Sequence, residues 1–169
     1  LALFIVSKAI DLMQGGKYIE AIDLIQENMY ESNIYQLAFL SYAYLQFALN
    51  NQENKQENYL LALQYADKVK NMYANINLDN YIKIHYAKKS MAYAQFVDGI
   101  VRLKIWGDKE NAIKQYHRIS NNDSKLAKDF YLNQKFECPN CGGEMVLKLK
   151  VTDVEKKEFI AKFVCPKCG

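Results

Sequence analysis

The stretch CPNCGGEMVLKLKVTDVEKKEFIAKFVCPKCG, residues 138–169, holds all four cysteines of the chain. They form two Cys-x-x-Cys pairs, Cys138 with Cys141 and Cys165 with Cys168, with 23 residues between the pairs. Each pair can form a tight knuckle that directs two thiolates at one ion, and two such pairs predict a tetrahedral metal site. The sequence therefore predicts one structural Zn²⁺, bound by Cys138, Cys141, Cys165 and Cys168. Gly142 and Gly169 follow the second cysteine of each pair, where the chain must turn.

The segment between the two pairs has the pattern of a β-hairpin. Hydrophobic and polar residues alternate over residues 145–151, and residues 159–164 form an apolar return strand. Residues 152–158 are polar and are expected to make the turn. A unit of about 32 residues cannot bury enough apolar surface to fold alone. Metal binding is expected to supply the missing stability, on the order of 10–16 kcal/mol for structural zinc.

These knuckles around a hairpin resemble the zinc-ribbon superfamily, and the resemblance covers residues 138–169 only. It implies a coordinatively closed zinc site of four cysteines that stabilises a small fold. The Cys-Pro-x-Cys-Gly knuckles are also similar to those of rubredoxins, which carry a one-electron iron site. Zinc is favoured over iron because Lys148 and Lys150 lie on a regular hairpin and the dense aromatic core of a rubredoxin is missing.

Outside this stretch, the composition predicts long helices. The chain has only seven glycines and two prolines, and both prolines lie inside the cysteine knuckles. Apolar residues recur at three- and four-residue spacings, which predicts about seven helices. Gly15-Gly16 is expected to end the first helix, and the second begins near Tyr18. The others are expected at residues 34–49, 57–73, 79 or 80 to 106, 109–120 and 124–134, with an exposed connection at 50–56.

The helices are expected to pack as antiparallel pairs. Three of them share a phrase beginning at Ala21 (AIDLI), Ala62 (ALQYA) and Ala112 (AIKQY). Together with the three-residue steps Gly15, Tyr18 and Ala21, this looks like the tetratricopeptide repeat, whose small and aromatic residues let two helices pack closely. The spacings of 41 and 50 residues between these alanines depart from that family's period of about 34.

The predicted fold is therefore mainly α. A tetratricopeptide-like α-solenoid of antiparallel helix pairs is expected at residues 1–133, and a zinc ribbon with a β-hairpin at 134–169. An aromatic stripe on a helix usually belongs to a core. Tyr35, Tyr42, Tyr44 and Tyr93 could instead lie on a concave surface and bind a peptide, since tyrosine offers contact area and a hydroxyl group.

No catalytic constellation is recognisable, so the chain is not expected to be an enzyme. His85 and His117 are isolated on predicted helices, and no phosphate-binding loop or nucleophile triad is present. The leading hypothesis is an adaptor that binds a protein or peptide partner through its helical surface. An accessory region of a larger enzyme, with its catalytic domain upstream of Leu1, is a further possibility.

The charge balance gives weaker support to nucleic-acid binding. Residues 134–169 carry seven lysines against five acidic residues, and a zinc ion with four thiolates adds a charge of about −2. The loaded ribbon is thus close to neutral, although its lysines form a candidate contact set for nucleic acid (Lys148, Lys150, Lys156, Lys157, Lys162 and Lys167).

The apolar run at residues 1–6 is too short to span a bilayer. A reducing, cytoplasmic location is expected because closely paired cysteines suit metal binding there. The oligomeric state is not indicated.

Overall fold

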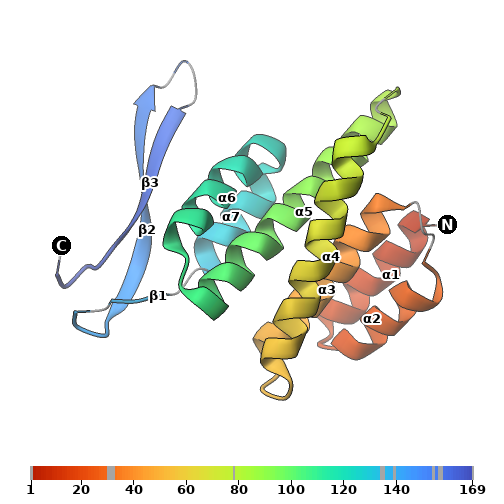
Figure 1. Ribbon diagram of the computed structural model, residues 1–169, viewed down its shortest axis with the longest axis horizontal. Coiled ribbons are helices and arrows are strands. Elements are labelled where there is room, and N and C mark those ends of the chain that lie inside the picture. Colours follow the sequence, from red (N-terminus) through yellow and green to blue (C-terminus); the bar gives the residue numbers. More distant parts are fainter. Residues whose placement is uncertain are drawn as a thin grey trace.

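A computed structural model describes residues 2–29, 33–77, 79–133, 136–138, 140–153, 155 and 158–168. For residues 131–133, 136–137, 146–153 and 158–163 it describes the backbone alone. Within these ranges the protein is mainly helical, with seven helices followed by three strands (Figure 1). The helices are α1 (Ala2–Gln14), α2 (Tyr18–Glu27), α3 (Ile34–Asn50), α4 (Lys55–Asn75), α5 (Tyr81–Trp106), α6 (Lys109–Asn122) and α7 (Ser124–Asn133). The strands are β1 (Phe136–Glu137), β2 (Glu144–Asp153) and β3 (Glu158–Val164).

Local signals in the sequence set most of the helix boundaries. Gly16 has a φ of 77° after α1, and Gly107 has a φ of 65° after α5, where a side chain would strain the backbone. The side chain of Asn33 accepts a hydrogen bond from the Gln36 amide and caps α3, and Asn80 caps α5 in the same way. The expected connection at 50–56 is shorter than predicted, because Asn54 adopts a left-handed conformation and α4 begins at Lys55.

Two hydrophobic clusters form the interior of the helical part. The smaller one contains residues of α1, α2 and α3. The larger one contains residues of the five helices from α3 through α7. Tyr42, Tyr44 and Tyr93 pack against both clusters, so aromatic rings connect them. Ala21, Ala62 and Ala112 are fully buried, as is expected for small residues where two helices pack closely. At Ala62 the approach is close enough for Ser41 of α3 to donate a 2.9 Å hydrogen bond to its carbonyl oxygen.

The three strands form a small antiparallel sheet in the order β1-β2-β3. The pairing of β2 with β3 runs from Val146 opposite Val164 to Asp153 opposite Glu158, with an irregularity between Val151 and Asp153. Part of the predicted polar turn at 152–158, including Lys156 and Lys157, lies outside the described residues. The sheet lies beside α6 (Figure 1), and the Lys109 ammonium group is 3.9 Å from the Met145 sulfur.

Candidate metal centre

The first cysteine pair lies on a turn between β1 and β2 that the backbone itself holds in shape. The Cys138 amide donates a 2.7 Å hydrogen bond to the Gly143 carbonyl oxygen, and the Gly142 amide donates one of 2.9 Å to the Cys138 carbonyl oxygen. Gly142 has a φ of 69°, as expected for glycine after the second cysteine. Gly143 donates its amide to the Cys141 sulfur at 3.4 Å, and a Cβ at Gly143 would lie 3.2 Å from that sulfur. These glycines therefore allow the chain to pass close to the thiolates.

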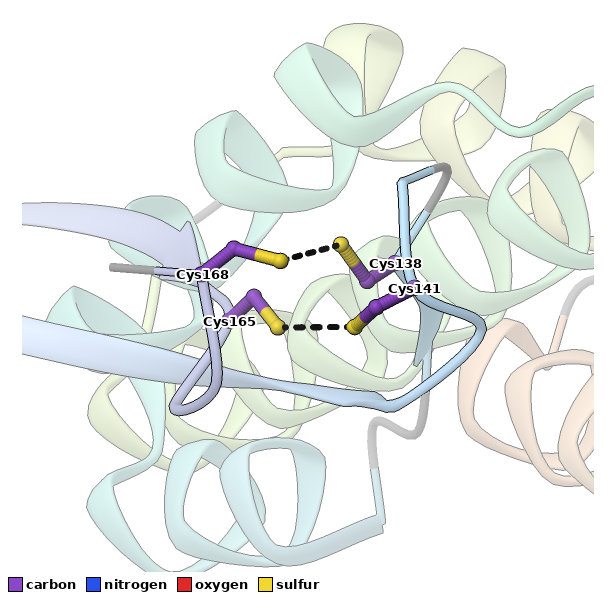
Figure 2. A group of neighbouring side chains, drawn as sticks. All are labelled: Cys138, Cys141, Cys165 and Cys168. Atoms are coloured by element: carbon purple, nitrogen blue, oxygen red, sulfur yellow. Dashed lines mark hydrogen bonds between the residues drawn. The ribbon is translucent and has the colours of Figure 1, made fainter.

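The second pair follows β3, and the antiparallel pairing of β2 and β3 brings it back to the first. Figure 2 shows the four side chains converging from the two turns. Cys138 Sγ lies 3.9 Å from Cys168 Sγ, and Cys141 Sγ lies 3.5 Å from Cys165 Sγ. All four sulfurs lie within 4.8 Å of one another. Residue Gly169, expected to complete the second turn, lies outside the described residues.

These distances fit a metal ion at the centre of the four sulfurs. Ligands about 2.3 Å from a tetrahedral zinc are about 3.8 Å apart, and the two measured sulfur pairs lie on either side of that value. No pair needs to move by more than about an ångström to reach the tetrahedral spacing. The four cysteines can thus hold a metal ion through sulfur alone.

Hydrogen bonds from the two turns favour the thiolate form, which is the form that a metal binds, at Cys138 and Cys165. The Cys168 amide donates to Cys165 and, with further hydrogen bonds from the Cys141 side chain and the Lys167 amide, lowers the pKa of its thiol to about 6. The Cys141 and Asn140 amides lower the pKa of Cys138 in the same way. The pKa of Cys168 is raised to about 12, first by Cys141 and then by the other two cysteines. Without a cation, each thiolate makes it harder for its neighbours to lose a proton. A central cation would remove this effect, because it favours the charged form of every ligand.

Among the described residues, no other group of three or more potential ligands comes together in this way. His85 is exposed, and burial lowers the pKa of the half-buried His117. Neither histidine lies with the cysteines. No described helix has the length and apolar character to cross a membrane.

A buried ionic cluster that sequence analysis did not anticipate joins α4, α5 and α6. Asp98 is 4 % exposed and accepts hydrogen bonds from the Lys70 ammonium group at 2.6 Å and from the side-chain amide of Asn111 at 2.8 Å. Arg102 Nε lies 3.3 Å from its carboxylate. Burial alone would raise the pKa of Asp98, but these hydrogen bonds and positive charges outweigh it, so that the pKa is lowered. Every charged group in the cluster is paired, which indicates a structural role.

Four tyrosines were expected either in the core or on a concave surface, and they lie in two different environments. Tyr35, Tyr42 and Tyr93 line one cavity. Tyr44 lies elsewhere, stacked on Tyr65 with ring centroids 5.6 Å apart and with its hydroxyl accepting a hydrogen bond from Gln26. Tyr18 joins the cavity although the sequence did not single it out for this role.

Comparison with known proteins found no match for this chain. Neither a protein-family model nor a curated protein nor a solved structure matches the chain. The role of the cysteine centre and of the helices is therefore argued from their own geometry.

Proposed function

We propose that this protein is a non-enzymatic adaptor, in which a solenoid-like stack of helix pairs binds a protein or peptide partner. A structural zinc ribbon follows the helices. The observation that carries this proposal is the pattern of helix contacts. Each helix packs against the helices next to it in the sequence. In addition, α3 packs against both α1 and α5, and α5 packs against α7.

This pattern is expected when helix pairs stack and the first helix of each pair lines a shared inner surface. The stack is tetratricopeptide-like and its units are unequal. Helices α4 and α5 have 21 and 26 residues, whereas α1 and α2 have 13 and 10. Unequal helices explain why the spacing of Ala21, Ala62 and Ala112 is longer than a tetratricopeptide period and is not constant.

The inner helices α1, α3, α5 and α7 supply most of the residues around a cavity of about 440 Å³. A volume of this size suits one or two side chains of a bound segment. Aromatic residues are frequent in protein interfaces because they bring area and hydrogen-bonding groups at little cost in side-chain entropy. These features support partner binding at this surface.

Zinc is the metal we assign to the cysteine centre. Four sulfur ligands at near-tetrahedral spacing suit Zn²⁺ and leave no coordination position for substrate or water. Such a site stabilises a fold and has no open position for hydrolytic chemistry, so we assign it a structural role. We infer that the strands and knuckles together form a zinc ribbon.

The adaptor function can be tested by crosslinking the full chain in lysate and identifying the captured proteins. Gln14 is exposed at the end of α1 and lines the cavity, so Gln14→Trp would obstruct it with little effect on the core. Gln52→Trp, in the exposed connection before α4, is the matched control. We expect a partner that wild type and Gln52→Trp capture and Gln14→Trp does not. Equal capture by all three, or none by any, would contradict binding at this surface.

A further inference from the structure

The cavity between the inner helices has an aromatic wall. Its lining includes five aromatic side chains, Tyr18, Tyr35, Phe39, Tyr42 and Tyr93. The ring of Phe39 lies 4.9 Å from that of Tyr93 and 5.7 Å from that of Tyr35, measured between centroids. The rings of Tyr42 and Tyr93 are 5.1 Å apart. These rings, tilted or edge to face with one another, form one aromatic cluster, and a ring face that it turns to the cavity attracts cations.

Two carboxylates lie beside this aromatic wall. Asp123, between α6 and α7, and Asp129, on α7, both line the cavity. The pKa of Tyr93 is raised well above its usual range, first by burial and then by Tyr35, Tyr42 and both carboxylates. Burial and then Asp129 raise the pKa of Tyr42, and Asp123 contributes to the raised pKa of Tyr35. The carboxylates therefore lie near the tyrosine hydroxyl groups.

Two lysines also line the cavity, so its formal charge is balanced. Lys125 is exposed, and water and salt screen its ammonium group. Lys89 is half-buried on α5. The charged groups that act on the hydroxyls of Tyr35, Tyr42 and Tyr93 are nevertheless the two carboxylates. A cation that stacks on the aromatic side of the cavity would therefore have a carboxylate nearby.

One polar group in the wall can bond a ligand directly. The side chain of Tyr35 lines the cavity, and among the described residues nothing forms a hydrogen bond with its hydroxyl group. A ligand that covers this hydroxyl and supplies a hydrogen bond is favoured over one that leaves it unpaired. Together with Asp123 and the side-chain amide of Gln46, this hydroxyl gives the cavity several hydrogen-bond acceptors.

We propose that this cavity binds the guanidinium group of an arginine side chain in a partner peptide, an inference that rests on the proposed adaptor function. A guanidinium group is planar and positively charged, and it carries five N–H donors. It can stack on aromatic rings while it donates to carboxylates, which matches the groups that line this wall. An ammonium group offers a point charge with three donors and uses the flat aromatic surface less well.

The test uses the zinc-loaded full chain and small probes in place of a partner. N-acetyl-arginine methylamide would be titrated into protein labelled at methionine methyl groups, because Met13 lines the cavity and reports on it by NMR. The neutral isostere N-acetyl-citrulline methylamide and the ammonium compound N-acetyl-lysine methylamide are titrated in parallel. We expect a saturable shift of the Met13 signal with the arginine probe, and binding at least about fivefold weaker with the other two.

Asp123→Asn is the informative variant. The Asp123 side chain caps α7 by accepting a hydrogen bond from the Leu126 amide at 3.1 Å, and asparagine caps equally well. The variant therefore removes the charge and keeps the cap. We expect it to weaken binding of the arginine probe about fivefold. Asp67→Asn, on the exposed face of α4, removes the same charge outside the cavity and is expected to leave binding unchanged.

Several results would overturn the inference: no saturable shift, citrulline or lysine binding as tightly as arginine, or full affinity in Asp123→Asn. They are separable from failure of the adaptor function. If a crosslinked partner is lost in Gln14→Trp and the arginine probe does not bind, the adaptor function stands and the arginine site is wrong. If the probe binds as expected and no partner is found, the cavity chemistry stands and the adaptor function is wrong.

Discussion

The ring of Phe130 in α7 lies directly against the backbone of Gly99 in α5. A Cβ atom at Gly99 would lie 2.8 Å from Phe130 Cε2 and 3.1 Å from Gln115 Cβ of α6. Three helices therefore meet where there is no room for a side chain. Glycine inside a helix is less favourable than alanine by about 1 kcal/mol, so close packing outweighs helix propensity at this position.

Gly99→Ala is expected to destabilise the protein by about 1–3 kcal/mol, despite the gain in helix propensity, because Phe130 is fully buried and cannot move aside freely. Urea unfolding would measure the change. Adding Phe130→Leu should recover part of the loss relative to the sum of the two single variants. Gly15→Ala is the control, since its Cβ would make only ordinary contacts at 3.5 Å or more. Equal stability of Gly99→Ala and wild type would contradict the packing argument.

Asp98→Asn is expected to cost about 2–3 kcal/mol at neutral pH, because it leaves Lys70 and Arg102 without their shared carboxylate in a largely buried cluster. Denaturant unfolding of the variant and wild type gives the difference. The same change at the exposed Asp67 should alter stability by less than about 0.5 kcal/mol. A difference no larger than that of the control would mean that the cluster contributes no net stability.

The contribution of Asp98 should depend on pH in a defined direction. Its pKa is lowered in the folded protein, so the stabilisation is fully present above the ordinary pKa of an aspartate in the unfolded chain. It is lost as the pH falls through the lowered folded pKa. The stability difference between wild type and Asp98→Asn should therefore shrink on acidification. Unfolding curves across the acidic range would show this, and a difference that grows instead would reverse the assigned sign.

Purified protein should contain one zinc ion, held by the four cysteines. Cys141→Ser should abolish stoichiometric zinc and unfold the strands, and it should leave most of the helical circular-dichroism signal because the helices have their own core. Asn140→Ser, exposed in the same knuckle, should retain both. Iron in elemental analysis would contradict the choice of metal. Loss of the whole helical signal would show that helices and strands fold as one unit.

Nucleic-acid binding is expected to be weak and to disappear with modest salt, because the chain carries a formal charge of only +3. The side chains of the lysine set on β2 and β3 lie outside the described residues, so this expectation rests on charge alone. Binding of short DNA and RNA would be measured at low and physiological salt. Submicromolar binding at physiological salt that is lost when Lys148, Lys150 and Lys162 become Glu would overturn the adaptor function.

The sequence predicted what depends on neighbouring residues and left open what depends on distant ones. Helix periodicity and the glycines at 15 and 16 act within one or two turns, as do Gly107 and the caps at Asn33 and Asn80 that the structure shows, and the predicted helix limits lie close to the observed ones. The start of α4 was missed, because its first residues, Lys55 and Gln56, are polar and are common in exposed connections.

Contacts across the chain were beyond local patterns. Asp98 resembles an ordinary helix-surface residue until Lys70, 28 positions earlier, is placed beside it. The same holds for the tyrosines, whose spacing does not tell whether a ring meets the core or a cavity. The cysteines were the exception, since a metal demands that distant ligands converge and so makes a long-range contact predictable from sequence.

The small number of helices that α1 and α2 contact has a consequence for the rate of amide hydrogen exchange. Among the described helices, these two pack mainly on each other and on α3, whereas α5 packs against α3, α4, α6 and α7. Elements with fewer packing contacts open at a lower free energy than central ones, so the amide protons of α1 and α2 should exchange with solvent earlier than those of α5. Ile10 and Met13 of α1 line the cavity between the inner helices. Transient opening of this end would therefore disturb the part of the cavity lining that α1 provides.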